Sequence, residues 1–471
     1  MRIYLANPPT VDRSRFTREG RCQQSEGVWT TVWPPLSLAQ SAAVLRDAGF
    51  DVLATDAPTQ GWDIQEFLDH LKTANPDLVV LATSTPSFPQ DVKTIEKIRL
   101  TLPDAVIAAI GIHVSVLTDV SFADAPALDA IIRGEPEYSL ISLAKSIKSQ
   151  GHATPEEGIS IRYDGKIEHG PDREYIKELD SLPFPAWDLF PIQEYRLPFV
   201  GRPFLLVTTA RGCPYQCSFC VAKSYYGRKV RRRSTKRIAE EVRWAGSRFG
   251  IKDFFFWSES TTLGREPMLE LCDEIAKVQP PIHWVCNSRV DHVDDELLAA
   301  MRRAGCWMLS FGIESADQNI LNRSQKKQTV EQTRNAVALA RKHKFQIAGH
   351  FVLGLPGETG ETLAETLKLA LELDLDYAQF YCAAPWPGSD LYQEASQEGW
   401  IENHGWSTFD QSHAILNYPH LTAQEIQAFR DRAVKAFYLR PKLIARTISR
   451  LRRPREAWRF LKAVRSYLTW I

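Results

Sequence analysis

The sequence predicts an α/β protein in three parts: an N-terminal doubly wound parallel sheet, a central partial (β/α)6 barrel and a C-terminal helical appendage. Short apolar runs alternate with helical patterns through the first two parts, as expected of parallel strands joined by helices. The 471 residues, 44% of them apolar, suffice for two or three domains. A run of about 18 apolar residues, which would predict a spanning helix, does not occur in the sequence.

The first part covers residues 1–150. Strands are expected at 3–5, 52–54, 78–81, 105–110 and 130–132, and helices at 36–48, 64–73 and 91–102. Ligands on doubly wound sheets bind outside the carboxyl ends of the strands. The loops that follow these strands are therefore candidate binding segments: 7–9, 82–88, 111–114 and 133–137.

Residues 151–200 are rich in proline and aromatic side chains and are expected to form a linker. Residues 201–395 repeat strand and helix, with strands expected at 205–207, 254–257, 284–286, 308–311, 347–350 and 377–381. Six such units predict a partial barrel whose chemistry lies at the carboxyl ends of its strands. Residues 396–471 form the helical appendage.

Three of the eight cysteines fall in one eight-residue stretch, at Cys213, Cys217 and Cys220. Three thiolates can hold three irons of a four-iron cluster and leave the fourth iron open to a substrate or cofactor. No fourth cysteine follows until Cys272. A structural zinc site would need a second pair of ligands at short spacing, and a disulfide framework is typical of small secreted domains. An oxygen-sensitive cluster and few cysteines instead favour a reducing cytoplasm.

The C-x3-C-x2-C spacing, with Phe219 before the third cysteine and Thr-Thr-Ala-Arg-Gly before the first, resembles the signature of the radical S-adenosylmethionine (SAM) superfamily. The resemblance implies a radical SAM barrel with a [4Fe–4S] cluster whose open iron chelates SAM. One electron from the cluster then cleaves SAM to methionine and a 5′-deoxyadenosyl radical. Cys213, Cys217 and Cys220 become the metal ligands, Cys217 a catalytic residue and Phe219 a cofactor contact.

The same resemblance assigns SAM contacts at the ends of the barrel strands. Ser258 and Glu259 would accept hydrogen bonds from the SAM ammonium group, and Arg289 would pair with its carboxylate through a planar fork. The alternative for Arg289 is a structural ion pair of the barrel. Glu314, in a Gly-Ile-Glu-Ser string typical of the group that carries a cobalamin domain, would approach SAM from the barrel lumen.

Later barrel strands supply the remaining candidates. Leu355 lies in a Gly-Leu-Pro-Gly-Glu-Thr string that matches the family and is expected near adenine. His350 and Cys382 are candidate catalytic residues near SAM and substrate. A satisfied core histidine and a small buried cysteine are the plain alternatives for these two.

The loops of the first part resemble the cobalamin-binding domain that precedes many radical SAM barrels, with a doubly wound, Rossmann-like sheet. The resemblance implies corrin contacts at Asn7, Ser84, Thr85, Gly111, His113, Gly134 and Glu135. Two departures stand out: the Asp-x-His-x-x-Gly motif is absent, and Ile110 replaces the first glycine of a Gly-Gly-x-His loop. The alternative is a domain that kept the fold and lost the cofactor.

Charge is uneven along the neutral chain. Residues 430–465 contain 13 basic and two acidic residues, a net charge of +11, so the rest carries −11. This tail mixes arginine with aromatic residues and predicts either a contact with an anionic membrane surface or a helix packed on the barrel. The run 228–233, with five basic residues, favours neutralising the cluster and gripping an anionic substrate over binding nucleic acid.

The closest resemblance within the class is to the hopanoid-biosynthesis-associated and anaerobic Mg-protoporphyrin cyclase-like branch, on stretches such as 83–88, 91–94, 383–400 and 417–422. It implies hydrogen abstraction from an unactivated carbon of a lipid or isoprenoid-type substrate, for rearrangement or cyclisation. The alternatives are a cobalamin-dependent C-methyltransferase and a non-catalytic corrinoid or iron–sulfur sensor. A flavodoxin- or ferredoxin-type electron donor is implied, and a cytoplasmic protein that meets the inner membrane face through its tail.

Overall fold

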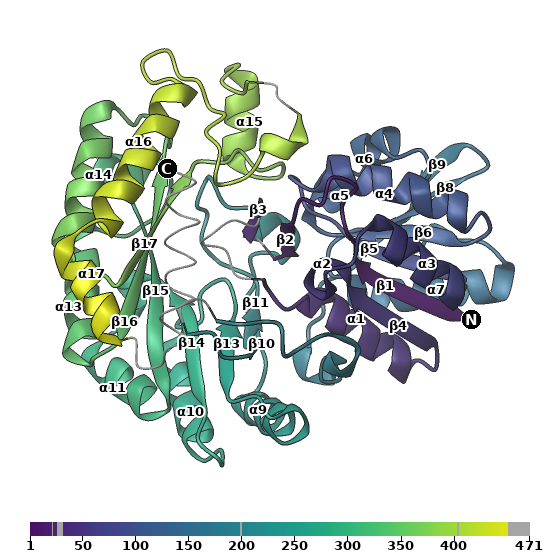
Figure 1. The fold of residues 1–471 in the computed structure, drawn as a ribbon, viewed down its shortest axis with the longest axis horizontal. Helices are drawn as coiled ribbons and strands as arrows, with labels where there is room; N and C mark the ends of the chain where they lie inside the picture. Colours follow the sequence, from purple (N-terminus) through teal and green to yellow (C-terminus); the bar gives the residue numbers. More distant parts are fainter. Residues whose placement is uncertain (21, 26–31, 198–199, 403–404, 451–471) are drawn as a thin grey trace.

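The computed structural model describes residues 1–20, 22–25, 32–197, 200–402 and 405–450. An N-terminal α/β domain lies beside a half-open barrel, and the C-terminal helices continue along the far edge of that barrel (Figure 1). The three-part α/β architecture that the sequence predicts is therefore confirmed.

The N-terminal sheet has seven strands in the order β4-β1-β5-β6-β7-β8-β9. Five are parallel: β1 (Arg2–Asn7), β4 (Asp51–Asp56), β5 (Leu78–Ala82), β6 (Val106–Ile110) and β7 (Ala130–Ile132). In chain order these strands run 2-1-3-4-5, so the direction of winding reverses between β1 and β5. Such a switch point is where doubly wound sheets bind their ligands.

Both faces of this sheet are covered, which explains its continuous apolar strands. Ile3 and Leu5 face one core, whereas Tyr4 and Ala6 face the other. The covering helices are α1 (Leu36–Asp47), α3 (Ile64–Ala74), α4 (Phe88–Thr101) and α7 (Pro136–Gln150).

The expected linker at 151–200 begins instead as part of this sheet. Strands β8 (Ile159–Tyr163) and β9 (Lys166–His169) extend it as an antiparallel edge. Only the following residues run as irregular chain, and they are held by buried aromatic side chains such as Trp187 and Tyr195. The prediction of a linker is therefore correct for the second half of the segment and wrong for its first half, which belongs to the sheet.

A small hairpin, β2 (Phe16–Glu19) and β3 (Cys22–Ser25), was not predicted because its strands are largely polar. Its polar side chains are bonded instead of solvated. Arg18 forms a buried ion pair with Asp91 at 2.6 Å, and the Gln23 carbonyl accepts a bond from the Thr85 amide at 2.7 Å. The hairpin lies between the N-terminal domain and the barrel (Figure 1).

The barrel contains six parallel strands in chain order: β10 (Phe204–Thr208), β13 (Asp253–Trp257), β14 (His283–Ser288), β15 (Cys306–Glu314), β16 (Gln346–Leu353) and β17 (Tyr377–Cys382). Its outer helices are α9 (Thr235–Phe249), α10 (Arg265–Ala276), α11 (Asp295–Arg303), α13 (Val330–Lys342) and α14 (Gly360–Glu372). Trp33, from the N-terminal domain, packs edge-on against Phe255 and Trp257 with ring centroids 5.1 and 5.3 Å apart. The N-terminal domain thus contacts the barrel wall directly.

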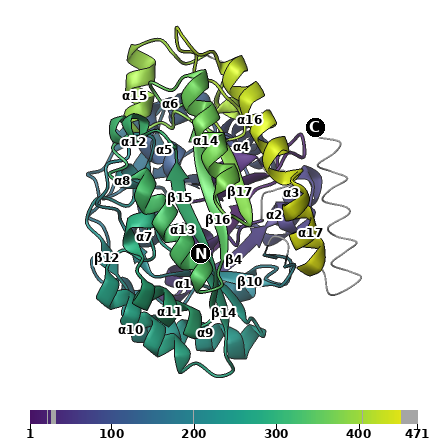
Figure 2. The same cartoon turned by 90° about the vertical axis from the view of Figure 1, so that its left-hand side faces the viewer.

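The C-terminal region contains α15 (Asp390–Gln397), α16 (Ala423–Tyr438) and α17 (Pro441–Arg450). Figure 2 shows α16 and α17 following one another along the barrel edge near β17. Arg446 pairs with Asp374 and Asp376 at 3.1 and 3.3 Å, so this part of the basic tail packs on the barrel. Residues 451–471 of the expected membrane contact lie outside the described residues. None of the described helices is long and apolar enough to cross a bilayer.

Candidate active site

The three clustered cysteines lie on a long loop at the carboxyl end of β10. The loop begins after β11 (Ala210–Arg211), contains the short helix α8 (Ala222–Tyr225) and returns through β12 (Arg231–Arg232), which pairs antiparallel with β11. We call residues 212–230 the cluster loop. Gly212 opens it with φ of 93°, and a Cβ there would lie 2.3 Å from the carbonyl oxygen of Lys229. Glycine is therefore required where the two arms cross.

Backbone and aromatic contacts fix the cluster loop on the barrel. The Ser218 amide donates to the Ser324 carbonyl at 3.0 Å, and the Leu391 amide donates to the Ser218 carbonyl at 2.9 Å. The Arg289 guanidinium lies 3.7 Å from the ring centroid of Tyr215. Contacts within the chain thus position the loop over the carboxyl ends of the barrel strands.

The chemistry of the three thiols fits a cluster. None of the seven cysteines with described side chains forms a disulfide, and Cys213, Cys217 and Cys220 are the ones that are partly exposed. Burial raises the pKa of Cys217 to about 11, while the nearby Lys326 and Arg289 lower it. In the described part of the chain no three His, Cys, Asp or Glu side chains converge as a single-ion site requires. A four-iron cluster gathers its three thiolates around a wider centre than a single ion does, because each thiolate binds a different iron.

Glu314 is the predicted SAM contact with the strongest local geometry. It ends β15 with φ of 68°, a left-handed conformation uncommon for a residue with a side chain. Its carboxylate forms a buried ion pair with the Lys326 ammonium at 2.5 Å. Sequence reasoning missed Lys326, which follows α12 (Gln318–Arg323) in a stretch without a recognisable motif.

The Arg289 guanidinium forms hydrogen bonds within the barrel. Its Nε and Nη2 donate to both carboxylate oxygens of Asp291, at 2.8 and 2.9 Å. Nη2 also donates to the carbonyl oxygens of Lys326 and Lys327. The structure therefore shows the barrel ion pair that the sequence left open, and a contact between Arg289 and SAM stays a prediction.

The other expected SAM contacts occupy the same end of the barrel. Ser258 is buried and bonded to Thr261 at 3.3 Å, and Glu259 beside it is half-buried. Leu355 is fully buried, and its amide donates to the Glu358 carboxyl group at 3.1 Å. Phe219 packs against the barrel core. The ends of β13 and β15 lie near the cluster loop, since Ser258 lines a pocket together with Gly212 and the Glu314 carboxylate affects Cys217. The individual SAM roles stay predictions.

Glu358 also shows how the turn after β16 is held. Its carboxyl group accepts bonds from the amides of Gly354 and Leu355. Burial raises the pKa of Glu358 to about 8, although these two bonds lower it.

The two catalytic candidates on β16 and β17 lie on different sides of the barrel wall. His350 faces the lumen side, stacked on Tyr381 with ring centroids 5.7 Å apart and Nδ1 3.2 Å from the tyrosine oxygen. The expectation that Cys382 is a catalytic residue near SAM and substrate is wrong. Cys382 lies on the same face of β17 as Ala378 and Phe380, the face that packs against α16, and its sulfur lies 3.9 Å from the side-chain carbonyl of Gln427 in that helix. Cys382 therefore belongs to the outer core, away from the site.

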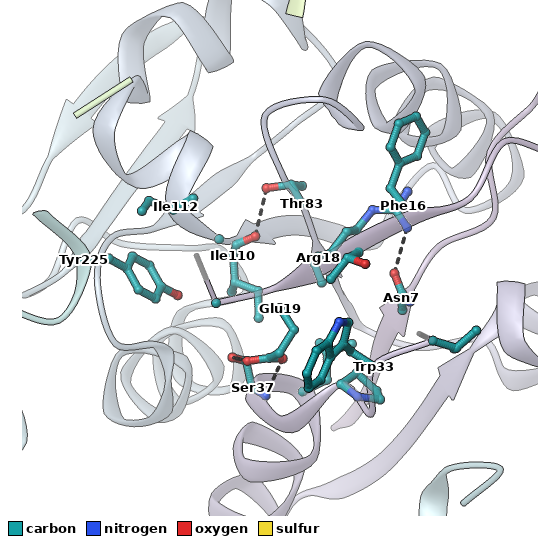
Figure 3. Close-up of a pocket in the computed structure, with 17 residues that line it drawn as sticks. Asn7, Phe16, Arg18, Glu19, Trp33, Ser37, Thr83, Ile110, Ile112 and Tyr225 are labelled. Atoms are coloured by element: carbon teal, nitrogen blue, oxygen red, sulfur yellow. Dashed lines mark hydrogen bonds between the residues drawn. The ribbon is translucent and has the colours of Figure 1, made fainter. Parts of the chain in front are cut away.

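A pocket opens at the switch point of the N-terminal sheet (Figure 3). It is lined from the ends of β1, β5 and β6, from the β2–β3 hairpin, from the start of α1 and from α8 of the cluster loop. Figure 3 shows Asn7, Thr83, Glu19 and Tyr225 around it, with Trp33 at one side. The pocket lies between the sheet and the cluster loop.

Two of the expected corrin contacts line this pocket, Asn7 and Gly111. Gly111 has φ of 130°, and a Cβ there would lie 2.3 Å from the Thr83 carbonyl oxygen. A residue with a side chain would therefore displace the pocket wall, as expected where a backbone must approach a ligand closely. Hydroxyl groups from Thr17, Ser37 and Tyr225 lie among apolar side chains in the lining. This mixture and the Gly111 cradle fit a corrin, whose ring is apolar and carries amide side chains.

The other expected contacts lie away from the cavity. Ser84 and Thr85 are buried behind its wall, and Gly134 donates its amide to Ser115 Oγ at 3.1 Å. His113 is fully buried between Phe88 and Trp406, and burial lowers its pKa to about 3. The assignment of His113 to the corrin is therefore not supported by its position.

The assignment of Glu135 as a corrin contact is also wrong. Glu135 lies in ion pairs with Arg211 and Arg231 of the barrel domain, at 3.2 and 2.8 Å, instead of in the pocket.

Glu19 is a pocket residue that sequence reasoning missed. Its carboxyl oxygens accept bonds from the amide and hydroxyl of Ser37, at 3.0 and 2.7 Å. Burial raises the pKa of Glu19 to about 7, although these bonds and Arg211 lower it. The hairpin that carries it has no apolar pattern, so no local signal pointed to it.

The basic run at 228–233 does not form one charged face. Arg231 is paired with Glu135, and Arg233 with Glu241 at 2.5 Å, and both arginines are buried. Arg228, Lys229 and Arg232 are the exposed members. The run is therefore partly a structural element of the cluster loop.

Comparison with known proteins agrees with this geometry. Residues 207–370 match the model of the radical SAM superfamily, and residues 27–144 match that of the B12 binding domain. The chain is 31% identical over 449 residues to an uncharacterized methyltransferase of Pyrococcus horikoshii, covering 95% of each chain. It is also 31% identical over 370 residues to the anaerobic magnesium-protoporphyrin IX monomethyl ester cyclase of Rubrivivax gelatinosus, covering 77% of this chain and 66% of that protein.

Among solved structures, the fold is similar to that of TsrM from Kitasatospora setae, a radical S-adenosylmethionine methyltransferase with cobalamin and a [4Fe-4S] cluster bound. The TM-score is 0.68 with 20% sequence identity, over 84% of this chain and 75% of that one. At this identity the likeness concerns the fold alone.

Proposed function

Because the chain belongs to the radical SAM superfamily, in the group that carries a B12-binding domain before the barrel, we propose that it is a cobalamin-dependent methyltransferase. Its cofactors are those of the group: a [4Fe–4S] cluster, SAM and cobalamin. The observation that carries the proposal is the pocket at the switch point, which is walled by both the corrin-type sheet and the cluster loop. Similarity to a methyltransferase over 95% of each chain supports it.

Each group of residues has a part in this proposal. Cys213, Cys217 and Cys220 would hold the cluster, which supplies the electron that cleaves SAM. The Glu314–Lys326 pair would place one negative and one positive charge where the amino and carboxylate groups of SAM bind. Gly111 and Asn7 would seat the corrin, which supplies a carrier for the methyl group.

Hydrogen abstraction from a lipid or isoprenoid for rearrangement or cyclisation was the first expectation from the sequence. The similarity to named methyltransferases supports the methyl-transfer alternative better. Cyclisation remains the second candidate because of the cyclase relatives. The lipid nature of the substrate, the membrane contact and a flavodoxin- or ferredoxin-type donor stay predictions.

Co-product analysis under reducing, anaerobic conditions tests the proposal. Methyl transfer through cobalamin forms S-adenosylhomocysteine, whereas radical generation forms 5′-deoxyadenosine. We expect S-adenosylhomocysteine from the protein loaded with both cofactors, and its loss when cobalamin is left out while 5′-deoxyadenosine persists. Formation of 5′-deoxyadenosine alone by the fully loaded protein would contradict methyl transfer and favour the second candidate. If the fully loaded protein forms neither product, the result would favour the sensor alternative.

A further inference from the structure

Two arginines with little solvent exposure mark the base of the cluster loop. Arg211 on β11 and Arg231 on β12 are direct cross-strand partners, and the whole loop with its three cysteines runs between them. Their side chains are 11% and 5% exposed. Two like charges at such a position repel one another and are costly to bury unless acidic partners lie between them.

Those partners come from the other domain. Glu135 and Glu137 lie at the carboxyl end of β7, in the B12-binding domain. Glu135 bridges the arginines, with Oε1 3.2 Å from Arg211 Nη1 and Oε2 2.8 Å from Arg231 Nη1. Glu137 pairs with Arg211 Nη2 at 2.5 Å. We call these four residues the ion clamp.

The ion clamp is tied to the corrin pocket by two hydrogen bonds. The amide of Gly134, next to Glu135, donates to Ser115 Oγ at 3.1 Å. Ser115 Oγ in turn donates to the carbonyl oxygen of Gly111 at 2.7 Å, and Gly111 lines the pocket. The pocket wall, the ion clamp and the cluster loop are therefore in continuous contact.

The charges of the clamp matter to any cluster held by the loop. Two carboxylates and two guanidinium groups sum to zero, and Arg211 lies only two residues before Cys213. Their burial removes most of the screening by salt and water. A cluster gains one negative charge on reduction, so an added positive charge nearby favours the reduced state and an added negative charge disfavours it.

We propose that the B12-binding domain positions the cluster loop through this ion clamp and, by keeping the clamp neutral, sets the reduction potential of the cluster. Glu137 and Arg211 are then positioning residues for the radical-forming step, contributed by different domains. The inference rests on the cluster and does not depend on methyl transfer, so failure of the co-product test above would leave it standing.

Opposite charge changes that break the same ion pair provide the test. The midpoint potential of the reconstituted cluster is measured by titration at one fixed pH, with the EPR signal of the reduced cluster as readout. Glu137→Gln leaves the clamp with a net positive charge and should raise the potential, whereas Arg211→Gln leaves it negative and should lower it. A purely structural pair would move both variants in the same direction, because each loses the same contact.

Two further variants complete the design. Glu137→Asp keeps the charge and should retain the wild-type potential, and the double variant Glu137→Gln/Arg211→Gln should return toward it. If a single variant fails to take up iron, recovery of iron by the double variant supports the clamp. Three results would overturn the proposal. The midpoint potentials of the two single variants could shift in the same direction, or not shift at all in clusters of full iron content. Iron loss in a single variant that the double variant does not reverse would also overturn it.

Discussion

Replacement of Cys217 by alanine should abolish both iron binding and SAM cleavage. Cys217 lies in the cluster loop beside Lys326 and Arg289, the cations that lower its pKa against the effect of burial. The loop supplies only three thiolates, so loss of one leaves too few protein ligands to retain a four-iron cluster. Iron content after anaerobic reconstitution and 5′-deoxyadenosine formation are the two readouts.

Cys272 provides a matched control. It is buried in α10, far along the chain from the cluster loop, and behaves as a small hydrophobic residue. Cys272→Ala should keep full iron content and SAM cleavage at a modest cost in stability, about 1 kcal/mol. A Cys217→Ala protein that still held its iron would show that the cluster is bound elsewhere.

Replacement of Lys326 by methionine should cost about 3–5 kcal/mol of unfolding free energy, the range for breaking a buried ion pair from one side. The side chains of Lys326 and Glu314 are each only 8% exposed, so the change leaves a buried carboxylate without its cation. It also removes a positive charge that lowers the pKa of Cys217, which should weaken cluster assembly. Urea unfolding of the cofactor-free protein measures the first effect, and iron uptake the second.

Two comparisons separate this effect from a general loss of charge. Lys277→Met breaks an exposed pair with Glu274, whose N···O distance is 2.8 Å, and should change the unfolding free energy little because water and salt screen the pair. The double variant Lys326→Met/Glu314→Gln removes the unpaired charge and should recover much of the lost stability. A Lys326→Met protein no less stable than Lys277→Met would contradict the role given to this pair.

How far the sequence could predict the site depends on whether the information is local. The cluster loop was predictable because its three ligands lie within eight residues and glycine punctuates its start. The strands were predictable because their apolar runs reflect burial on both faces. Cys382 shows a signal that was present and overlooked. Along β17 the half-buried Tyr377, Gln379 and Tyr381 alternate with buried residues, and Cys382 falls in the buried set.

Other features depend on contacts between distant segments, which no local pattern records. Lys326 meets Glu314 only because the chain after α12 turns back over the barrel. Glu135 lies at the carboxyl end of a strand, where corrin contacts are expected, but it forms ion pairs with two arginines of the barrel domain. The polar β2–β3 hairpin forms because Arg18 and Gln23 find partners in the N-terminal domain. In each case tertiary pairing decided the outcome.

Metal analysis of the anaerobically reconstituted, desalted protein tests most directly whether one chain holds both cofactors. We expect about one cobalt and about four irons per chain in the wild type. Gly111→Ala should keep the iron and lose most of the cobalt, because its Cβ would lie 2.3 Å from the Thr83 carbonyl oxygen. Gly165→Ala, also at positive φ with open space around its Cβ but in the β8–β9 turn, should keep both metals. Wild-type protein with full iron and no cobalt would contradict the account and indicate a domain that kept the fold without the corrin.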